Sequence, residues 1–412
     1  RTLAIGAAFG VITVLGPKSA GQVEVATFRR DAQYSDGRHP DAVTFSSAEE
    51  DACRRDFTIN GLFYDPVEDR VIDFVGGQAD LERQVVRAIG DPHERFTEDK
   101  LRLLRAVRFA TTLDFALDAQ TADAVRIMAR EIVVVSPERI AAEMRRLLTA
   151  DRRAAGMRLL LATGLAEAIL PEIVPHSEAE RAALEDALAV LDRLSLARFP
   201  LALAAIVGPR VGPAGIRAVG QRWRLSNREV ERAAWLATEL PLLLRADRVR
   251  FSDVQPMLIH RGIEELVALG EAVEPDSPGA AYCRAALCRP REELDPPPLV
   301  DGAALLAHGV RRGPQFGRLL AGARRAQLDG EITTREEALA QIDQLANSDS
   351  PFMEESGMDK KAKKKIQTLN ERIQKLRQQL AGARKQADDP SELQTLEQQI
   401  AQAEAEIAKL KG

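Results

Sequence analysis

The stretch Leu101-Arg-Leu-Leu-Arg-Ala-Val-Arg-Phe109 decides how the chain is interpreted, because its apolar residues recur at helical spacing. Leu101, Leu104 and Val107 fall on one face of a helix, and arginines occupy positions between them. Similar spacing continues from about Asp80 to residue 346, and prolines divide it into helices of ordinary length. No fixed-period repeat is present, so the sequence predicts packed helices rather than a solenoid.

Upstream of this helical part, the chain has the pattern of β-strands. Phe9–Leu15 is rich in β-branched residues, and Gln22–Phe28 alternates polar with apolar side chains. Glycine and proline lie between the two segments, so we expect a hairpin. The polar segment Arg29–Thr44 predicts a mobile loop, and Ser46 or Ser47 is placed to cap the helix that follows. The fold class that we predict is therefore α+β.

Two later segments have a different composition. Cys288–Pro298 is rich in proline and charge, which indicates a linker or a long loop between helices, and residues 347–357 also have the composition of a linker. Beyond them, apolar residues step by threes and fours in two runs, and Pro390 between the runs can begin the second helix. We predict a coiled-coil helical hairpin over residues 358–412, with self-association as its expected role.

Composition sets broad limits on the class of protein. A length of 412 residues is enough for two to four domains. The net charge of -5 does not by itself indicate a nucleic-acid-binding protein, so the local distribution of charge has to decide. Cys53, Cys283 and Cys288 form no CxxC pair and no disulfide framework, which favours a reduced, cytoplasmic location. We find no apolar run long enough to cross a membrane, and we expect no membrane partner.

Arg54-Arg-Asp-Phe-Thr-Ile-Asn60 is the first segment that carries chemistry. Two arginines lie beside an aspartate and an asparagine in a segment that is otherwise apolar. A guanidinium keeps its charge and can donate two parallel hydrogen bonds, which suits a phosphate. The alternative is an Arg–Asp pair on a solvated helix, which is the commoner meaning of a bare Arg-Arg-Asp sequence.

Glu98–Phe109 is the second such segment. If it forms one helix, residues three apart make a slowly winding row with its acidic end in the first turn. The row consists of Asp99, Arg102, Arg105 and Arg108. An aspartate beside an arginine offers acceptors and donors in one plane, which matches the edge of a nucleobase, and the other arginines match a triphosphate. The alternative is a ladder of ion pairs along the helix, worth about a few tenths of a kcal/mol per pair.

Together these two segments resemble a known family. Arg54–Asn60 is similar to the nucleotide-binding motif of class II tRNA nucleotidyltransferases and bacterial poly(A) polymerases, and Glu98–Phe109 resembles the EDxxRxxRxxRF helix of that family. Further elements follow in the family's order; they include Pro40–Phe45, Ile72–Gly77, Arg87–Pro92, Ser136–Ile140 with Glu143, and Leu170–Ile173. The resemblance is close over about residues 5–175.

The resemblance implies roles for particular residues. Members of the family extend RNA 3′ ends from CTP and ATP without a nucleic-acid template. By position, Asp99 and Arg102 would pair with the incoming base, and the loop Arg29–Thr44 would let the pocket switch between bases. The residues that would bind the phosphates and ribose, or support that pocket, are Arg55, Arg105, Arg108, Asp56 and Asn60.

The same resemblance implies a division into domains and a function. Residues 1–79 would be a nucleotidyltransferase head, 80–150 a helical neck that selects the nucleotide, and 151–346 a helical body and tail that bind tRNA. The expected function is the addition of CCA, or part of it, to tRNA 3′ ends. The alternatives are a poly(A) polymerase, an enzyme that adds only A or only CC, and a catalytically inactive tRNA-binding protein.

The chain departs from the family at the metal site. The family holds two Mg²⁺ ions with a DxD pair that follows a GGxxRD motif, and neither motif occurs in this sequence. Glu24 is a candidate third acidic residue near the metals, and equally a candidate exposed glutamate of a strand. The metal ligands are therefore unknown. We expect a chain that is truncated at its N-terminus and shows no measurable nucleotide addition by itself, because one carboxylate cannot hold two cations.

Overall fold

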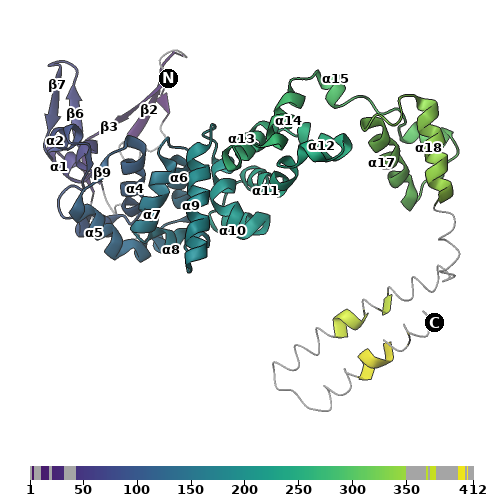
Figure 1. Cartoon of the computed structure of the whole chain (residues 1–412). Coiled ribbons are helices and arrows are strands. Elements are labelled where there is room, and N and C mark those ends of the chain that lie inside the picture. The colour runs from purple at the N-terminus through teal and green to yellow at the C-terminus, as the bar shows by residue number, and fades with distance from the viewer. Residues whose placement is uncertain are drawn as a thin grey trace. The chain divides into compact units, whose positions relative to one another are not determined.

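The computed structural model describes residues 2–3, 11–17, 21–31, 43–348, 368–369, 372–376, 398–403 and 406. Small sheets lie near the N-terminus and helices dominate the rest of the described chain (Figure 1), which confirms the predicted α+β class. The chain divides into two compact units, Arg1–Pro297 and Pro298–Gly412. This boundary falls in the proline-rich segment that the sequence marked as a linker or long loop. The finer boundaries, at residues 79/80 and 150/151, stay predictions.

The first described strands form an antiparallel sheet in the order β1-β2-β3, which confirms the hairpin. They are β1 (Thr2–Leu3), β2 (Val11–Leu15) and β3 (Gln22–Ala26). The predicted loop over Arg29–Thr44 is wrong at both ends, because β4 (Arg29–Asp31) pairs antiparallel with β5 (Val43–Phe45). Backbone pairing overrides the polar composition there. The middle of that loop lies outside the described residues.

A short helix and a turn follow and carry the first motif. α1 (Ala48–Cys53) begins after Ser47, whose hydroxyl accepts a hydrogen bond from the Glu50 backbone N–H at 3.2 Å, as predicted. Then come the 3-10 helix η2 (Thr58–Asn60), β6 (Leu62–Asp65), β7 (Arg70–Asp73) and α2 (Gly77–Glu82). A Cβ at Gly77 would lie 2.2 Å from the Thr58 carbonyl oxygen, so only glycine lets α2 approach η2 this closely.

One hydrophobic core unites the helices of the first unit. α4 (Leu101–Leu113) packs against α6 (Pro137–Leu148) and α7 (Arg153–Ala162). Within α4, Leu103, Leu104 and Val107 are fully buried. The parallel two-residue strands β8 (Val85–Val86) and β9 (Ala116–Leu117) both contact α4. The helices are α3 (Pro92–Glu98), α4 (Leu101–Leu113), α5 (Ala119–Met128), η3 (Ala129–Val134), α6 (Pro137–Leu148), α7 (Arg153–Ala162), α8 (Leu165–Ile169), η4 (Pro171–Ile173), α9 (Glu178–Arg193), α10 (Phe199–Arg222), α11 (Asn227–Leu243), η5 (Ala246–Arg248), α12 (Phe251–Leu258), α13 (Ile263–Val273), α14 (Pro278–Leu287) and α15 (Arg291–Leu294).

α10 corrects the expectation that no apolar run is long enough to cross a membrane. Among the described residues it is the one helix that meets this length and composition. Half of its most apolar window is buried, and Leu201 and Val207 belong to the core. The helix is interrupted at Gly212, where φ is 61° and ψ is -170°, between two prolines. Its apolar composition is accounted for by packing against α9 and α11.

The second unit has a core of its own. Its helices are α16 (Gly302–Ala307), α17 (Pro314–Leu328) and α18 (Arg335–Ser348). Leu305, Leu319 and Ile342 lie at the centre of that core. The predicted linker and most of the predicted hairpin lie outside the described residues. Within the described part of that hairpin, a small apolar cluster consists of Leu369, Ile373, Leu376, Ile400 and Ala403.

Candidate functional site

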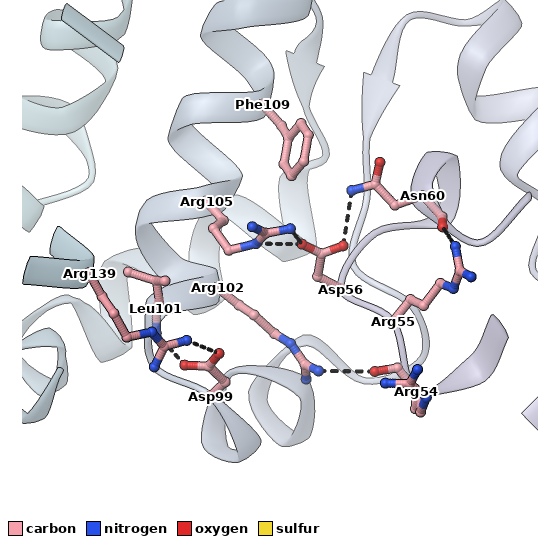
Figure 2. Close-up of a pocket in the computed structure, with 10 residues that line it drawn as sticks. All are labelled: Arg54, Arg55, Asp56, Asn60, Asp99, Leu101, Arg102, Arg105, Phe109 and Arg139. Atoms are coloured by element: carbon pink, nitrogen blue, oxygen red, sulfur yellow. Dashed lines mark hydrogen bonds and ion pairs between the residues drawn. The ribbon is translucent and has the colours of Figure 1, made fainter. Parts of the chain in front are cut away.

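A polar cavity of about 550 Å³ opens where the first motif faces α4 and α6. Figure 2 shows the side chains that line it, which come from the α1–η2 segment, the α3–α4 turn, α4 and α6. They are Arg54, Arg55, Asp56, Asn60, Asp99, Leu101, Arg102, Arg105, Phe109 and Arg139. Five arginines and two aspartates give this lining a formal charge of +3. Such a cavity suits an anionic ligand with polar edges.

Asp56 joins the two sides of the cavity. Its Oδ2 atom pairs with Arg105 of α4, at 2.7 Å from Nε and 2.6 Å from Nη2. Its Oδ1 atom accepts hydrogen bonds from the side-chain amide of Asn60 at 3.0 Å and from the Phe57 backbone N–H at 2.9 Å. Asp56 is only 7% exposed, and these bonds satisfy a carboxylate that burial would otherwise penalise. Asp56 and Asn60 therefore support the pocket, and Arg105 is oriented before any ligand arrives.

Arg55 is fixed on the opposite wall. Its Nη1 donates to the Asn60 carbonyl oxygen at 2.7 Å. Its guanidinium carbon lies 4.6 Å from the centroid of the Phe63 ring, which is cation–π distance. The Arg55 side chain is 35% exposed, so part of the guanidinium remains open to the cavity.

Arg102 is the most enclosed arginine of the lining, at 8% exposed. Its Nη1 donates to the Arg95 carbonyl oxygen at 2.9 Å and pairs with Glu98, and its Nη2 donates to the Arg54 carbonyl oxygen at 3.0 Å. A guanidinium has five N–H groups. Three are therefore engaged by described residues, and the Nε–H and one Nη2–H are left for a ligand.

Asp99 corrects the predicted row on one helix. Its backbone is extended, with φ of -146° and ψ of 106°, and it lies in the turn between α3 and α4. Its Oδ1 atom accepts from the Leu101 backbone N–H at 3.0 Å, so Asp99 precedes the helix instead of belonging to its first turn. Its Oδ2 atom pairs with Arg139 of α6 at 2.6 Å. The structure nevertheless brings Asp99 and Arg102 to the same cavity.

Arg108 lies away from the cavity lining. It is 7% exposed, its Nε pairs with Glu143 of α6 at 2.6 Å, and its guanidinium carbon lies 3.5 Å from the centroid of the Phe109 ring. Burial lowers the pKa of the Arg108 guanidinium, against the opposing effect of Glu143. The same Glu143 also lies 3.8 Å from Nη1 of Arg105.

Glu24 also lies outside this lining. It is an exposed residue at the middle of β3, paired in register with Thr13 of β2. In the part of the chain that the structure describes, no group of three or more His, Cys, Asp or Glu side chains is gathered as metal ligands.

Family models match two parts of the chain, and known proteins are similar to it over most of its length. Residues 1–87 match a family model described as the poly A polymerase head domain, and residues 114–176 match one described as the probable RNA and SrmB-binding site of polymerase A. Together with the fold, these matches place the chain in the class of nucleotidyltransferases that includes CCA-adding enzymes and poly(A) polymerases. The CCA-adding enzyme of Limosilactobacillus reuteri is 30% identical over 340 residues, which are 81% of this chain and 80% of that protein. The chain belongs to the CCA-adding enzyme family.

Solved structures are also similar to this chain. The Bacillus stearothermophilus CCA-adding enzyme, solved in complex with CTP, has a TM-score of 0.69 and 26% identity, and the match covers 85% of each chain. The Thermotoga maritima CCA-adding enzyme, solved with a tRNA, has a TM-score of 0.54 and 22% identity over 82% of this chain and 78% of that one. Because its identity is only 22%, the Thermotoga maritima match supports a similar fold and nothing more.

The sequence interpretation missed several residues of the site. Arg54 and Phe109 line the cavity, and both lie in segments that the sequence singled out. Arg139 comes from Ser136–Ile140, which was quoted only as part of the resemblance. Its signal was therefore present, but its contact with Asp99 depends on how α6 packs against α4.

Proposed function

We propose that this protein is a nucleotidyltransferase that adds CCA to the 3′ ends of tRNA from CTP and ATP, without a nucleic-acid template. The observation that carries the proposal is the cavity in which Asp99 and Arg102 lie beside further arginines. The CCA-adding relatives, among them one solved with CTP, support it. Poly(A) synthesis and the addition of only A or only CC remain the alternatives within the class.

Asp99 and Arg102 provide the chemistry for choosing the base. Cytosine and adenine each carry an exocyclic amino group, which donates, beside a ring nitrogen that accepts. Uracil and guanine carry a carbonyl oxygen and a ring N–H at the corresponding positions. A carboxylate acceptor beside a guanidinium donor matches the first arrangement and repels the second. Asp99 uses two of the carboxylate's roughly four lone-pair sites, and Arg102 retains two N–H groups for the base.

Arg105 and Arg55 are proposed to bind the phosphates and ribose. Both line the cavity, both are held by neighbouring groups, and neither is fully buried. Charge-assisted hydrogen bonds from such oriented guanidiniums suit a triphosphate. Arg108 stays a predicted ligand; its Nε pairs with Glu143 at 2.6 Å, and its side chain lies outside the cavity lining.

Mg²⁺ is part of the proposal, because nucleotidyl transfer releases pyrophosphate and cations neutralise the developing charge. The described residues do not fit a site for it. Glu24 is exposed on β3, and the carboxylates of the cavity are already committed to arginines. We therefore assign no metal ligand.

The remaining proposals concern partners and location. The helical part to residue 346 is proposed to bind the tRNA, and residues 358–412 are proposed to self-associate. A cytoplasmic location is proposed from cysteine usage alone.

The test combines nucleotide binding with tRNA extension by the full chain. Binding of CTP, ATP, GTP and UTP is measured by isothermal titration, and a tRNA lacking its 3′ CCA is incubated with CTP, ATP and magnesium. We expect CTP and ATP to bind in preference to GTP and UTP. A folded chain that binds no nucleotide would overturn the proposal. The products of the extension reaction distinguish CCA, CC, single A and poly(A) addition.

A further inference from the structure

Asp51 is a buried carboxylate that touches the cavity only through other residues. It lies on α1, is 3% exposed, and is not part of the lining. Its Oδ1 atom accepts from Nε and Nη2 of Arg54 at 3.0 and 2.7 Å, and its Oδ2 atom accepts from Nε and Nη2 of Arg55 at 3.2 and 3.1 Å. One carboxylate thus makes two forked pairs with consecutive arginines.

The Arg55 side chain is held on its other side as well, and the Arg54 backbone is bonded to Arg102. Arg55 donates from Nη1 to the Asn60 carbonyl oxygen and lies over the Phe63 ring. The Arg54 carbonyl oxygen accepts from Nη2 of Arg102. An arginine side chain has considerable rotamer freedom to lose when it binds a phosphate. Asp51 restricts that freedom before a ligand binds. It also holds the guanidiniums of Arg54 and Arg55 close together despite their like charge.

We propose that Asp51 is a positioning residue for the triphosphate of the incoming nucleotide, acting through Arg54 and Arg55. The inference rests on the proposed function, since it takes the ligand to be CTP or ATP. Asp51 makes no contact with the nucleotide. It fixes the Nε and Nη2 edge of each guanidinium, so that the remaining donor edge of Arg55 meets the phosphates in one orientation.

Charge and position predict opposite effects for Asp51, which makes the inference testable. Removal of its negative charge raises the positive charge of the site, so a purely electrostatic role predicts tighter triphosphate binding. Removal of the four hydrogen bonds from Arg54 and Arg55 loosens one edge of each guanidinium, so a positioning role predicts weaker binding. Asp51 is buried behind Arg54 and Arg55 and its charge acts on the phosphates only from a distance, whereas the loss of orientation acts directly on the donors. We therefore expect position to dominate.

The experiment compares CTP with CMP in the full chain. Kd values for both are measured by isothermal titration for the wild type, Asp51→Asn and Asp51→Glu. Asn keeps the size without the charge, and Glu keeps the charge but displaces the carboxylate. We expect both variants to bind CTP about tenfold more weakly, the equivalent of one charge-assisted hydrogen bond. The loss for CMP is expected to be smaller, so that the preference for CTP over CMP decreases.

Asp114→Asn is the matched control, because Asp114 pairs with Arg152 at 2.9 Å on an exposed surface and its loss changes the net charge equally. It should bind CTP like the wild type. Unchanged or tighter CTP binding by Asp51→Asn would overturn the inference, as would equal losses for CTP and CMP. If neither Asp51 variant folds, Asp51 serves the stability of the fold and the inference also fails. A wild type that binds neither nucleotide would instead contradict the proposed function.

Discussion

Arginine–carboxylate pairs occur in two settings in the first unit, around the cavity and on the outer faces of the helices. Around the cavity, Arg105–Asp56 and Arg139–Asp99 join residues 49 and 40 positions apart. On the outer face of α5, Arg126 pairs with Asp123 of the same helix, and both side chains are more than half exposed. Water screens the outer pair, so it contributes little. The long-range, shielded pairs fix the geometry of the site, and the difference lies in burial and separation, not in chemistry.

Arg105→Ala should have the largest effect, because it removes a phosphate donor and the partner of Asp56 together. A charge-assisted hydrogen bond is worth about 1.5–3 kcal/mol, so the affinity for every nucleotide should fall roughly ten- to a hundredfold. Selectivity should stay, since a phosphate contact carries no base information. Titration with CTP, ATP, GTP and UTP measures both quantities. Altered selectivity at unchanged affinity would contradict the role of Arg105.

Arg102→Ala should change base choice more than affinity. Its two remaining N–H groups lie beside Asp99, where they can meet a base edge. We expect the preference for CTP and ATP over GTP and UTP to decrease, by about tenfold for one lost hydrogen bond. Equilibrium titration measures this, and thermal unfolding checks that the variant is folded. A variant that keeps full selectivity and loses only affinity would show that Arg102 does not read the base.

Glu229→Gln tests the Arg145–Glu229 pair, whose exposure is intermediate between the pairs around the cavity and the pair on α5. The Arg145 guanidinium lowers the pKa of the Glu229 carboxyl to about 2, helped by Ser226 and opposed by burial. Because the folded pKa is below the ordinary 4.5, this pair stabilises the fold above about pH 4.5 and ceases to do so as the pH falls towards 2. After allowance for solvent screening, the variant should lose about 1 kcal/mol at pH 7. Urea unfolding between pH 3 and 7 should show that difference shrinking with acid; a difference independent of pH would exclude the linkage.

Arg126→Ala should have the smallest effect. Its pair with Asp123 is exposed and local, so we expect the free energy of unfolding to change by less than about 0.5 kcal/mol. Nucleotide affinity should stay the same. Urea unfolding provides the measurement. A loss above about 1 kcal/mol would show that exposure does not predict how much an ion pair contributes to stability.

The sequence predicted what depends on local pattern. The hairpin of β2 and β3, the Ser47 cap and the helical character after residue 80 follow from periodicity and capping residues. Most of the cavity lining comes from the two segments that the sequence singled out. These properties need no knowledge of how distant elements pack.

The rest depends on where helices begin and how they face each other. The sequence interpretation assigned Asp99 to the helix. In the structure, its side chain accepts a hydrogen bond from the Leu101 N–H, and α4 begins after Asp99. Arg108 follows Arg102 by six residues, and at 3.6 residues per turn it points about 120° away, towards Glu143. The contact of Arg139 with Asp99 and the burial of Asp51 require the packed structure. No local pattern contains that information.

The bond from Arg102 to the Arg54 carbonyl oxygen has a consequence for how this protein can evolve. The side chain proposed to read the base also ties α4 to the segment proposed to bind the phosphates. A single substitution at position 102 therefore alters both the preference for a base and the alignment of α4 with the Arg54–Asn60 segment. A lineage that drifts towards another nucleotide has to compensate at a second position, or change Asp99 while Arg102 stays. We expect natural variation in specificity to arise at the carboxylate, with the arginine retained as the constraint on that variation.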